Sequence, residues 1–380
     1  MSTKLLFISN IIGKGIGSFS AASIKAAKEL GYEYHMAANF NNSSPERMKE
    51  DEENFGITIH HIDFVRQPYD LRNIKAYRQV TNLINEEYFD IIHCNTPIGG
   101  VIGRLAGRKC RVKKIIYQVH GFHFYSGAPM RNWLIYYPIE KWLAHYTDAL
   151  ITINSEDYSR AQKKFHLKNY GKVYYVPGVG IDLSKFSDSE LKSRDQIRNE
   201  LALKEEDFVC ISAGDLVPRK NYEVAIRAVS LVEGNRIQYL ICGLGPEKEK
   251  LEKLAKELGV ERNVHFLGYR TDILDLYRAS DFFLFTSFQE GLPRSTMEAM
   301  ASGLPIICSN IRGNNDLVAE GINGYLCNPN SPSEFSEAMH KIYADSELKD
   351  RMSKRNMEDI NKFSLDSVSN EIKKIYASYG

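Results

Sequence analysis

The segment FFLFTSFQEGLPRSTMEAMASGLPIICS, residues 282–309, predicts the fold of the chain. Its first apolar run, Phe282–Ser287, has the length and the aromatic content of a buried strand. A Gly-Pro turn follows, and a helix is expected to begin at about Pro293, because proline is favoured at the first helical position. Gly303 is expected to end this helix before a second strand at Pro305–Ser309. A strand, a helix and a strand in this order predict parallel strands joined by a crossover helix.

The same alternation continues over nearly the whole chain. Apolar, strand-like runs are separated by helix-length spacers, which predicts parallel sheets with helices on both faces. A first series of strands is expected at Lys4–Ser9, Tyr34–Ala38, Ile57–His60, Ile91–Cys94, Ile115–Val119 and Ala149–Asn154. A second series is expected at Phe208–Ala213, Gln238–Cys242, Val264–Leu267, Phe282–Ser287 and Pro305–Ser309. Two series predict an α/β protein with two doubly wound, Rossmann-like domains.

A break separates the two series. Pro177-Gly178-Val179-Gly180 interrupts any regular element, so we expect an N-terminal domain over residues 1–175 and a C-terminal domain over residues 176–364. The tail, residues 365–380, carries apolar side chains at helical spacing and has no strand after it. We expect this tail to form a helix that docks back across the domains onto the N-terminal one. Ligands of open α/β sheets bind at the carboxyl ends of the strands, so motifs at strand ends are the candidates for function.

Composition restricts the class of protein. The chain has 380 residues, 43% of them hydrophobic, which is enough for two cores, and its net charge of +1 predicts no nucleic-acid partner. No apolar run approaches the roughly 18 residues of a membrane span, and Leu5–Ile8 is interpreted as a strand rather than an export signal. The six cysteines lie far apart, mostly in strand-like segments, which indicates reduced core thiols. We expect a soluble, cytoplasmic protein.

Two carboxylates flank the expected helix start in the opening segment. Glu290 follows the strand, Glu298 lies in the second turn of the helix, and the free backbone N–H groups between them form an anion site. A phosphate bound there would leave one carboxylate for a ribose diol and the other for sugar hydroxyls. The alternative is that Arg294 and Glu298, one turn apart, only form a surface ion pair and that Glu290 is solvated. This segment alone leaves both interpretations open.

The pattern Glu-x7-Glu followed by Ala-Met-Ala-x-Gly-x-Pro resembles the signature of the family 4 retaining glycosyltransferases, which have the GT-B fold of two domains facing across a cleft. Tyr117–Phe124, with a helix expected after it at Asn132–Asp148, resembles the branch that builds capsular and exopolysaccharide repeat units. The resemblance covers the whole second half of the chain. Its further segments there are Val173–Asp182, Gly214–Asn221 (GDLVPRKN), Gly243–Pro246, Val264–Arg270 and Asn323–Tyr325.

The resemblance implies a role for each matching residue. Lys220 contacts the donor diphosphate, Glu298 holds the ribose hydroxyls, and Glu290 lies near the transferred hexose. His120 reaches the reacting sugar from the N-terminal domain, whereas His123 is expected to be an ordinary strand-end histidine. The implied catalytic residues are therefore His120, Glu290 and Lys220. The expected donor-binding residues are Gly15, Gly17, Arg219, Lys220, Tyr269, Arg270, Glu290, Gly291, Leu292, Arg294, Ser295 and Glu298.

One position departs from the family pattern. Many members have Arg directly after the glycine that matches Gly214, and this chain has Asp215. A carboxylate does not bind phosphate, so neutralisation is expected to fall on Lys220, helped by Arg219, and Asp215 could instead pair with one of these cations. The chain also contains no Asp-x-Asp, the pair with which GT-A transferases recruit a metal ion. Lys220 and the helix N-terminus can replace that ion, so we expect no metal and no cofactor beyond the nucleotide-sugar co-substrate.

The predicted reaction moves a sugar, an N-acetylhexosamine or a deoxy relative, from a UDP-sugar donor to a lipid-diphosphate-linked sugar acceptor. It proceeds with retention of configuration, in capsule or exopolysaccharide synthesis. Two alternatives belong to other classes: a UDP-sugar epimerase of the GT-B fold, and a non-catalytic two-domain sugar-binding module.

A lipid-linked acceptor also predicts a peripheral position on the inner face of the cell membrane. Six cations carry this prediction, because unpaired charges are not buried and basic residues are attracted to anionic lipid. The segment Met130–Ala144 contains Trp133 and Trp142, whose rings favour membrane interfaces, but it is apolar nearly all round. Burial in the core and contact with the membrane both remain open for it. The six cations, the basic cluster, are Arg104, Arg108, Lys109, Arg111, Lys113 and Lys114.

Overall fold

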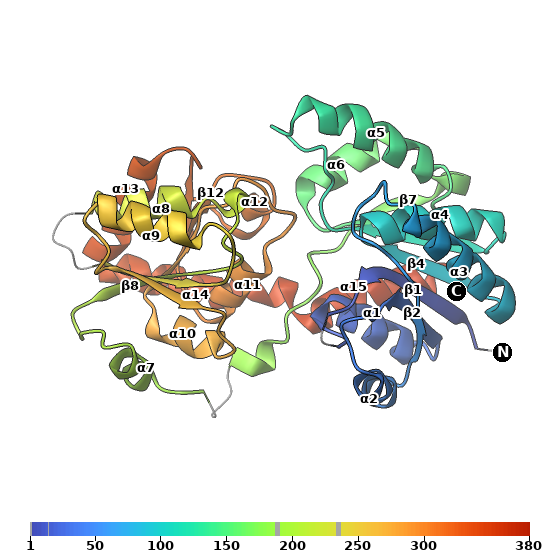
Figure 1. The fold of residues 1–380 in the computed structure, drawn as a ribbon, viewed down its shortest axis with the longest axis horizontal. Coiled ribbons are helices and arrows are strands. Elements are labelled where there is room, and N and C mark those ends of the chain that lie inside the picture. The colour runs from blue at the N-terminus through green and yellow to red at the C-terminus, as the bar shows by residue number, and fades with distance from the viewer. Residues whose placement is uncertain (1, 14, 187–190, 233–236) are drawn as a thin grey trace. The chain divides into compact units, whose positions relative to one another are not determined.

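The computed structural model describes residues 2–13, 15–186, 191–232 and 237–380 and divides into two compact units (Figure 1). Unit 1 comprises Met1–Gly180 and Phe363–Gly380, and unit 2 comprises Ile181–Lys362. The chain therefore passes between the units at residues 180/181 and 362/363, rather than at the expected 175/176 and 364/365.

Unit 1 contains a seven-stranded parallel sheet with the strand order β3-β2-β1-β4-β5-β6-β7. Its strands are β1 (Lys4–Ile11), β2 (Glu33–Asn39), β3 (Thr58–His61), β4 (Ile91–Asn95), β5 (Lys114–Val119), β6 (Ala149–Thr152) and β7 (Lys172–Tyr175). Its α-helices are α1 (Ser18–Glu29), α2 (Pro45–Phe55), α3 (Arg72–Glu87), α4 (Pro97–Lys109), α5 (Met130–Ala144), α6 (Ser155–Lys164) and α15 (Leu365–Ala377).

Both faces of this sheet are buried, as the near-continuous apolar strands predict. Leu5 and Phe7 of β1 belong to a core cluster with side chains of α1 and α15, and Leu6 and Ile8 belong to a cluster with α3 and α4. Helix α15 packs on α1, so the C-terminal tail does return to unit 1. Its Tyr376 hydroxyl lies 2.6 Å from Nδ1 of the buried His93, which ties the tail to the sheet.

Unit 2 contains a six-stranded parallel sheet with the order β10-β9-β8-β11-β12-β13. Its strands are β8 (Phe208–Ala213), β9 (Ile237–Cys242), β10 (Val264–Gly268), β11 (Phe282–Phe285), β12 (Ile306–Ser309) and β13 (Gly324–Cys327). Its α-helices are α7 (Arg194–Glu200), α8 (Tyr222–Ser230), α9 (Lys248–Glu257), α10 (Ile273–Ala279), α11 (Arg294–Ala301), α12 (Asn314–Leu317), α13 (Pro332–Ala344) and α14 (Ser346–Asp359).

The α/β prediction of two doubly wound, Rossmann-like sheets is confirmed. Each sheet runs outward from its first strand in one direction and then continues from that strand in the other. This order places a crevice at the carboxyl ends of the two central strands, which are β1 and β4 in unit 1 and β8 and β11 in unit 2. All six cysteines are free thiols. Within the described ranges, no helix has the length and apolar content needed to cross a membrane.

Candidate active site

In unit 2, the predicted residues Arg219, Lys220 and Glu290 meet at the carboxyl ends of β8 and β11. Oε1 of Glu290 accepts hydrogen bonds from Lys220 Nζ at 2.8 Å and from Arg219 Nη1 at 3.0 Å. Ser287 donates a third hydrogen bond to the same oxygen at 2.9 Å. The side chains of Lys220 and Glu290 are only 11% and 12% exposed, so solvent screens their interaction weakly. Glu290 is therefore not the freely solvated carboxylate of the alternative interpretation.

The strand end holds the loop that carries these cations. Thr286 donates a hydrogen bond to the carbonyl of Lys220 at 3.1 Å, and the amide of Phe288 donates to the carbonyl of Arg219 at 2.8 Å. Gly214 has a φ of +155°, and a Cβ added there would lie 3.3 Å from Cε of Lys220. The loop after β8 thus needs a glycine to let the lysine chain lie against it.

Asp215 does not pair with either cation. Its side chain is exposed and forms no ion pair with any residue that the structure describes, whereas Arg219 and Lys220 both contact Glu290. The prediction that Asp215 could pair with Arg219 or Lys220 is therefore wrong. Geometry explains the outcome, because Glu290 reaches both cations from the facing strand end.

Helix α11 begins beside this cluster. Pro293 is its N-cap and provides no side-chain cap, so the first backbone N–H groups of the helix are not occupied by a capping side chain. Arg294 Nε donates to Oε1 of Glu298 at 2.7 Å, so the surface ion pair of the alternative interpretation does form. Glu298 is nevertheless 19% exposed, against 47% for Arg294. Leu292 and Ser295 lie next to the same helix start, and their contact with the donor stays a prediction.

The strand-end segment after β10 provides an exposed aromatic ring. Tyr269 is 74% exposed, and its neighbour Arg270 forms two hydrogen bonds with Asp272, at 2.8 and 2.5 Å. These bonds and the charge of Asp272 raise the pKa of Arg270 above its usual value. The guanidinium is thus held in place by its own loop, and the tyrosine ring beside it is available to a ligand.

In unit 1, His120 lies at the carboxyl end of β5. Its Nε2 lies 2.8 Å from Oδ1 of Asn95, at the end of β4, and its ring packs against Phe19 with a centroid distance of 4.1 Å. Because Asn95 Oδ1 is an acceptor, Nε2 carries the proton and Nδ1 retains its lone pair. Burial lowers the pKa of His120 to about 3, so the imidazole is neutral near pH 7.

The two predicted glycines of unit 1 differ. Gly15 has a φ of +128°, which favours glycine whatever the space, and a Cβ there would lie 2.7 Å from Nε of Arg47, whose side chain would have to shift. A Cβ at Gly17, the N-cap of α1, would have no atom within 4 Å. Of these two predicted glycines, Gly17 therefore leaves open space beside the backbone and Gly15 does not.

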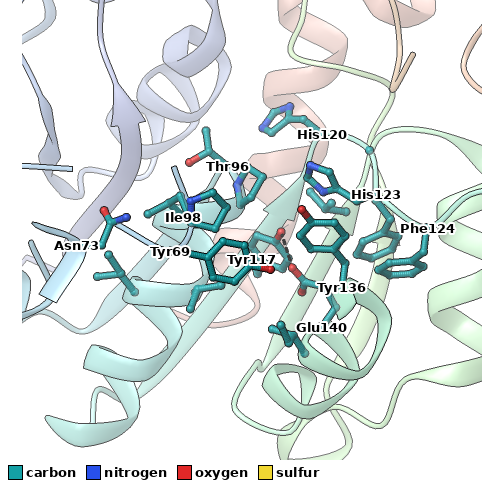
Figure 2. Close-up of a pocket in the computed structure, with 18 residues that line it drawn as sticks. Tyr69, Asn73, Thr96, Ile98, Tyr117, His120, His123, Phe124, Tyr136 and Glu140 are labelled. Atoms are coloured by element: carbon teal, nitrogen blue, oxygen red, sulfur yellow. Dashed lines mark hydrogen bonds between the residues drawn. The ribbon is translucent and has the colours of Figure 1, made fainter. Parts of the chain in front are cut away.

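Unit 1 also contains a cavity of about 470 Å³ behind His120 (Figure 2). Thr96 and Ile98 at the start of α4 form one wall, and Tyr136 and Glu140 of α5 form another. His123 lines the cavity as well, with its ring 4.6 Å from that of Tyr136. The segment Tyr117–Phe124, which the sequence singled out, lines the cavity, but the other walls come from segments that are far apart in the chain.

Arg104 does not belong to an exposed basic cluster. It is 1% exposed, its Nη1 lies 2.8 Å from Oε2 of Glu140, and its guanidinium lies 3.8 Å from the ring centroid of Tyr117. Tyr117 in turn donates a hydrogen bond to Glu140 at 3.3 Å (Figure 2). Of the other five cations in that cluster, Lys113 also has a partner, Asp90 at 2.6 Å.

The segment with both tryptophans is helix α5, and it is buried on one side only. Trp133 is partly buried against Phe124, at a centroid distance of 5.7 Å. Trp142 is 49% exposed, and Leu134 is 71% exposed. One face of the helix is therefore buried in the core and the other is exposed, and contact of the exposed face with a membrane stays a prediction. The large apolar side chains of the exposed face are Met130, Leu134, Ile135, Ile139 and Trp142.

Comparison with known proteins agrees with this architecture. Residues 14–185 match the family described as Glycosyltransferase Family 4, and residues 193–359 match Glycosyl transferases group 1. The crystal structure of Anabaena Alr3699/HepE in complex with UDP has a TM-score of 0.79 and 21% sequence identity, and the similarity covers 99% of this chain and 100% of that one. At that identity the likeness establishes the fold, which is GT-B.

Two curated relatives are more similar in sequence. EpsD of Bacillus subtilis (strain 168), provisionally named a glycosyltransferase, is 33% identical over 100% of this chain and 97% of that protein. The UDP-Gal:alpha-D-GlcNAc-diphosphoundecaprenol alpha-1,3-galactosyltransferase of Escherichia coli is 30% identical over 80% of each chain. The chain belongs to glycosyltransferase family 4, as its motifs predicted, and it is a glycosyltransferase.

Proposed function

We propose that this glycosyltransferase moves a sugar from a UDP-sugar to a lipid-diphosphate-linked sugar, with retention of configuration, in exopolysaccharide or capsule synthesis. The observation that carries the proposal is the cation cluster at the β8/β11 crevice, where Lys220 and Arg219 converge on Glu290. A nucleoside diphosphate gains negative charge as its bond to the sugar breaks, and fixed cations next to it lower the barrier.

The cluster can bind a diphosphate while Lys220 and Arg219 keep their hydrogen bonds to Glu290. Lys220 has three N–H donors, and Glu290 is its only hydrogen-bond acceptor among the residues that the structure describes, so two donors remain. Arg219 is half-exposed and also uses part of its donor set. With one carboxylate and two cations, the cluster keeps a net charge of +1. The uncapped start of α11 adds backbone N–H groups of the kind that bind phosphate.

The nucleoside would use the residues around this cluster. Tyr269 offers an exposed ring for the base. Glu298 is paired with Arg294 through Oε1, and its carboxylate can still accept hydrogen bonds from the ribose hydroxyls. UDP is supported as the nucleotide by the UDP complex of the structural neighbour and by the UDP-Gal donor in the name of the Escherichia coli relative. The sugars to test first are N-acetylhexosamines, which the family branch implies, and galactose.

Unit 1 would hold the acceptor. The same relative is named for a GlcNAc-diphosphoundecaprenol acceptor, which supports a lipid diphosphate here. A neutral His120 beside Asn95 can exchange hydrogen bonds with sugar hydroxyls without introducing a charge. No metal is required by this arrangement, since the charge of the leaving diphosphate is met by Lys220, Arg219 and the start of α11.

A lipid acceptor also calls for membrane contact, and we propose that helix α5 provides it. Its exposed face combines large apolar side chains with the cations Arg131 and Lys141, the composition of a helix that lies in a membrane interface. Arg108 extends this surface, because it stacks on Tyr146, whose ring contacts that of Trp142 at 5.3 Å. Docking through α5 would place the enzyme peripherally on the inner face of the membrane.

The test is a UDP-release assay with a panel of UDP-sugars, in the presence and absence of GlcNAc-diphosphoundecaprenol. We expect one donor to release UDP only when the lipid acceptor is present, and the product to carry the donor's anomeric configuration. Conversion of the UDP-sugar without any acceptor would identify an epimerase instead. Binding without UDP release for every donor, with the lipid acceptor present, would contradict the proposed reaction.

A further inference from the structure

A second cavity in unit 1 adjoins the one in Figure 2. Its volume is about 460 Å³, close to the 470 Å³ of the first. The two cavities share a wall formed by the start of α4, the residue pair His123 and Tyr136, and Pro68. A single ligand can therefore occupy both, with one part on each side of this wall.

The first cavity is apolar and offers no free charge. Val101, Ile102 and Ile139 line it together with aromatic rings and a few polar side chains, among them His120. Its one acid, Glu140, is already paired with the buried Arg104 at 2.8 Å. Filling such a cavity with hydrocarbon removes apolar surface from water at no electrostatic cost. A volume of this size is typical of ligand sites.

The second cavity is polar and suits an anion. Arg66 lines it and is exposed, without a hydrogen bond or ion pair to any residue that the structure describes. Asn10, near the end of β1, is only 9% exposed, and its side-chain oxygen has no hydrogen-bond partner; as an acceptor this oxygen suits a hydroxyl group of the ligand and not the phosphate itself. Thr96 does not cap this 13-residue helix and Pro97 has no N–H, so the N–H groups of Ile98 and Gly99 are the ones that remain available. Among the described residues that line this cavity, none is acidic.

The two cavities lie at the crevice that the strand order predicts. Asn10 lies near the end of β1 and Thr96 follows β4, the two central strands of the unit 1 sheet. Ligands of doubly wound sheets bind at this position, and anions bind at the helix that starts there. The arrangement is an apolar chamber joined to a cationic one, which matches an amphiphile whose anionic group is attached directly to a hydrocarbon chain.

We propose that the second cavity binds the diphosphate of the lipid-linked acceptor and that the first cavity binds the isoprenoid units next to it. The inference rests on the proposed function for the identity of the lipid. Arg66 and the α4 N-terminus hold the diphosphate, and Val101 and Ile139 contact the chain. Ile139 is also 40% exposed on the α5 surface, so the chain has an apolar route from this cavity to the membrane.

The experiment measures the affinity of the full chain for farnesyl diphosphate, farnesol and inorganic diphosphate by calorimetry. Arg66→Ala removes the cation of the second cavity, and Val101→Phe fills the first one from a partly exposed position on α4. The matched controls are Arg78→Ala, an exposed arginine on α3, and Leu105→Phe, one turn further along α4. Neither control residue lines either cavity.

We expect Arg66→Ala to weaken farnesyl diphosphate about 10-fold or more and to leave farnesol unchanged, because one charge-assisted contact is lost. Val101→Phe should weaken farnesyl diphosphate on the order of 10-fold and leave inorganic diphosphate unchanged, because only the chain loses its space. Both controls should bind like the parent. Equal affinity of all variants for farnesyl diphosphate overturns the proposal. The proposal is also overturned if the parent binds dodecanoate, which has a hydrocarbon chain but no diphosphate, as tightly as farnesyl diphosphate.

This result is separable from the proposed reaction. If no UDP-sugar is turned over but the variants show the expected binding pattern, the cavity assignment stands and the proposed function fails. If sugar is transferred but Arg66→Ala and Val101→Phe leave the KM for the lipid acceptor unchanged, the cavity assignment fails and the function stands.

Discussion

The pair formed by Lys220 and Glu290 gives the sharpest test of the donor site. If the pair only stabilises unit 2, removing either partner should have similar consequences for nucleotide binding. If Lys220 holds the diphosphate, the two removals should act on UDP in opposite directions. Lys220→Ala takes away a cation, whereas Glu290→Gln takes away an anion 2.8 Å from that cation and leaves the shape of the side chain intact.

The expected magnitudes follow from burial and from the donors that remain. Lys220 is 11% exposed, so its contact with a phosphate would be poorly screened. Losing a charge-assisted hydrogen bond costs about 1.5–3 kcal/mol, which corresponds to a UDP dissociation constant raised about 10- to 100-fold. The effect on kcat should be larger, on the order of 10²–10³, because charge develops on the leaving group in the transition state.

Glu290→Gln should leave UDP affinity unchanged or raise it, while transfer falls through the loss of a contact to the hexose. Stability should change little in Lys220→Ala, since Glu290 keeps Arg219 and Ser287 as partners. Calorimetry with UDP, steady-state transfer kinetics and thermal unfolding measure the three quantities. Two results would refute the reasoning: a folded Lys220→Ala variant with normal UDP affinity and kcat, or a Glu290→Gln variant that loses as much UDP affinity as Lys220→Ala.

Five further predictions concern the rest of the site and the exposed face of α5. Glu298→Gln should weaken UDP about 10-fold, since a ribose hydroxyl loses a charged acceptor, while the affinity for inorganic diphosphate stays the same; equal loss for both ligands would contradict this. Transfer should survive EDTA, and activity that requires added Mg²⁺ or Mn²⁺ would show the metal-free assignment to be wrong. His120→Ala should lower kcat more than His123→Ala, with UDP affinity unchanged. Because the pKa of His120 is lowered to about 3, the imidazole should stay neutral as the pH falls from 8 to 5. A change in transfer rate near pH 6.5 that disappears in His120→Ala would show that the imidazole does become protonated in this range. Finally, Leu134→Ser with Trp142→Ser should release the protein from anionic vesicles, and undiminished sedimentation with those vesicles would exclude docking through α5.

The sequence predicts most of the fold because the pattern that defines a buried parallel strand is local. β8 has the bounds predicted for it, Phe208–Ala213, and the other predicted strands shift by at most a few residues at their ends. Two strands, β7 and β13, were not among the predicted ones. Both lie at the edges of their sheets and contain partly or fully exposed positions. The edge position alone does not explain the omission, because the other two edge strands, β3 and β10, were predicted.

The contacts of the site were less predictable, and Arg104 illustrates why. In the sequence it stands among cations without an acid nearby, which indicates an exposed cluster. A signal against that was present, because Gly100 and Gly103 let α4 approach the sheet closely; a Cβ at Gly100 would lie 2.4 Å from Tyr117. Arg104 lies one turn from Gly100 and therefore shares the packed face. Its partner, Glu140, comes from another helix, and no local pattern could have identified it.

The two crevices suggest how one chain distinguishes two diphosphates. Unit 2 offers Arg219 and Lys220, unit 1 offers Arg66, and each has an uncapped helix start at the same place in its strand order, so the phosphate contacts alone discriminate poorly. The neighbouring groups differ. Tyr269 and Glu298 suit a base and a ribose, and they offer nothing to a hydrocarbon chain. The apolar chamber lined by Val101 and Ile139 suits a chain, and it would leave the polar atoms of a nucleoside without hydrogen bonds, a loss that excludes such ligands effectively. Selectivity between donor and acceptor is therefore expected to reside in these neighbours, and exchanging the cations between the units should change affinities without exchanging the ligands.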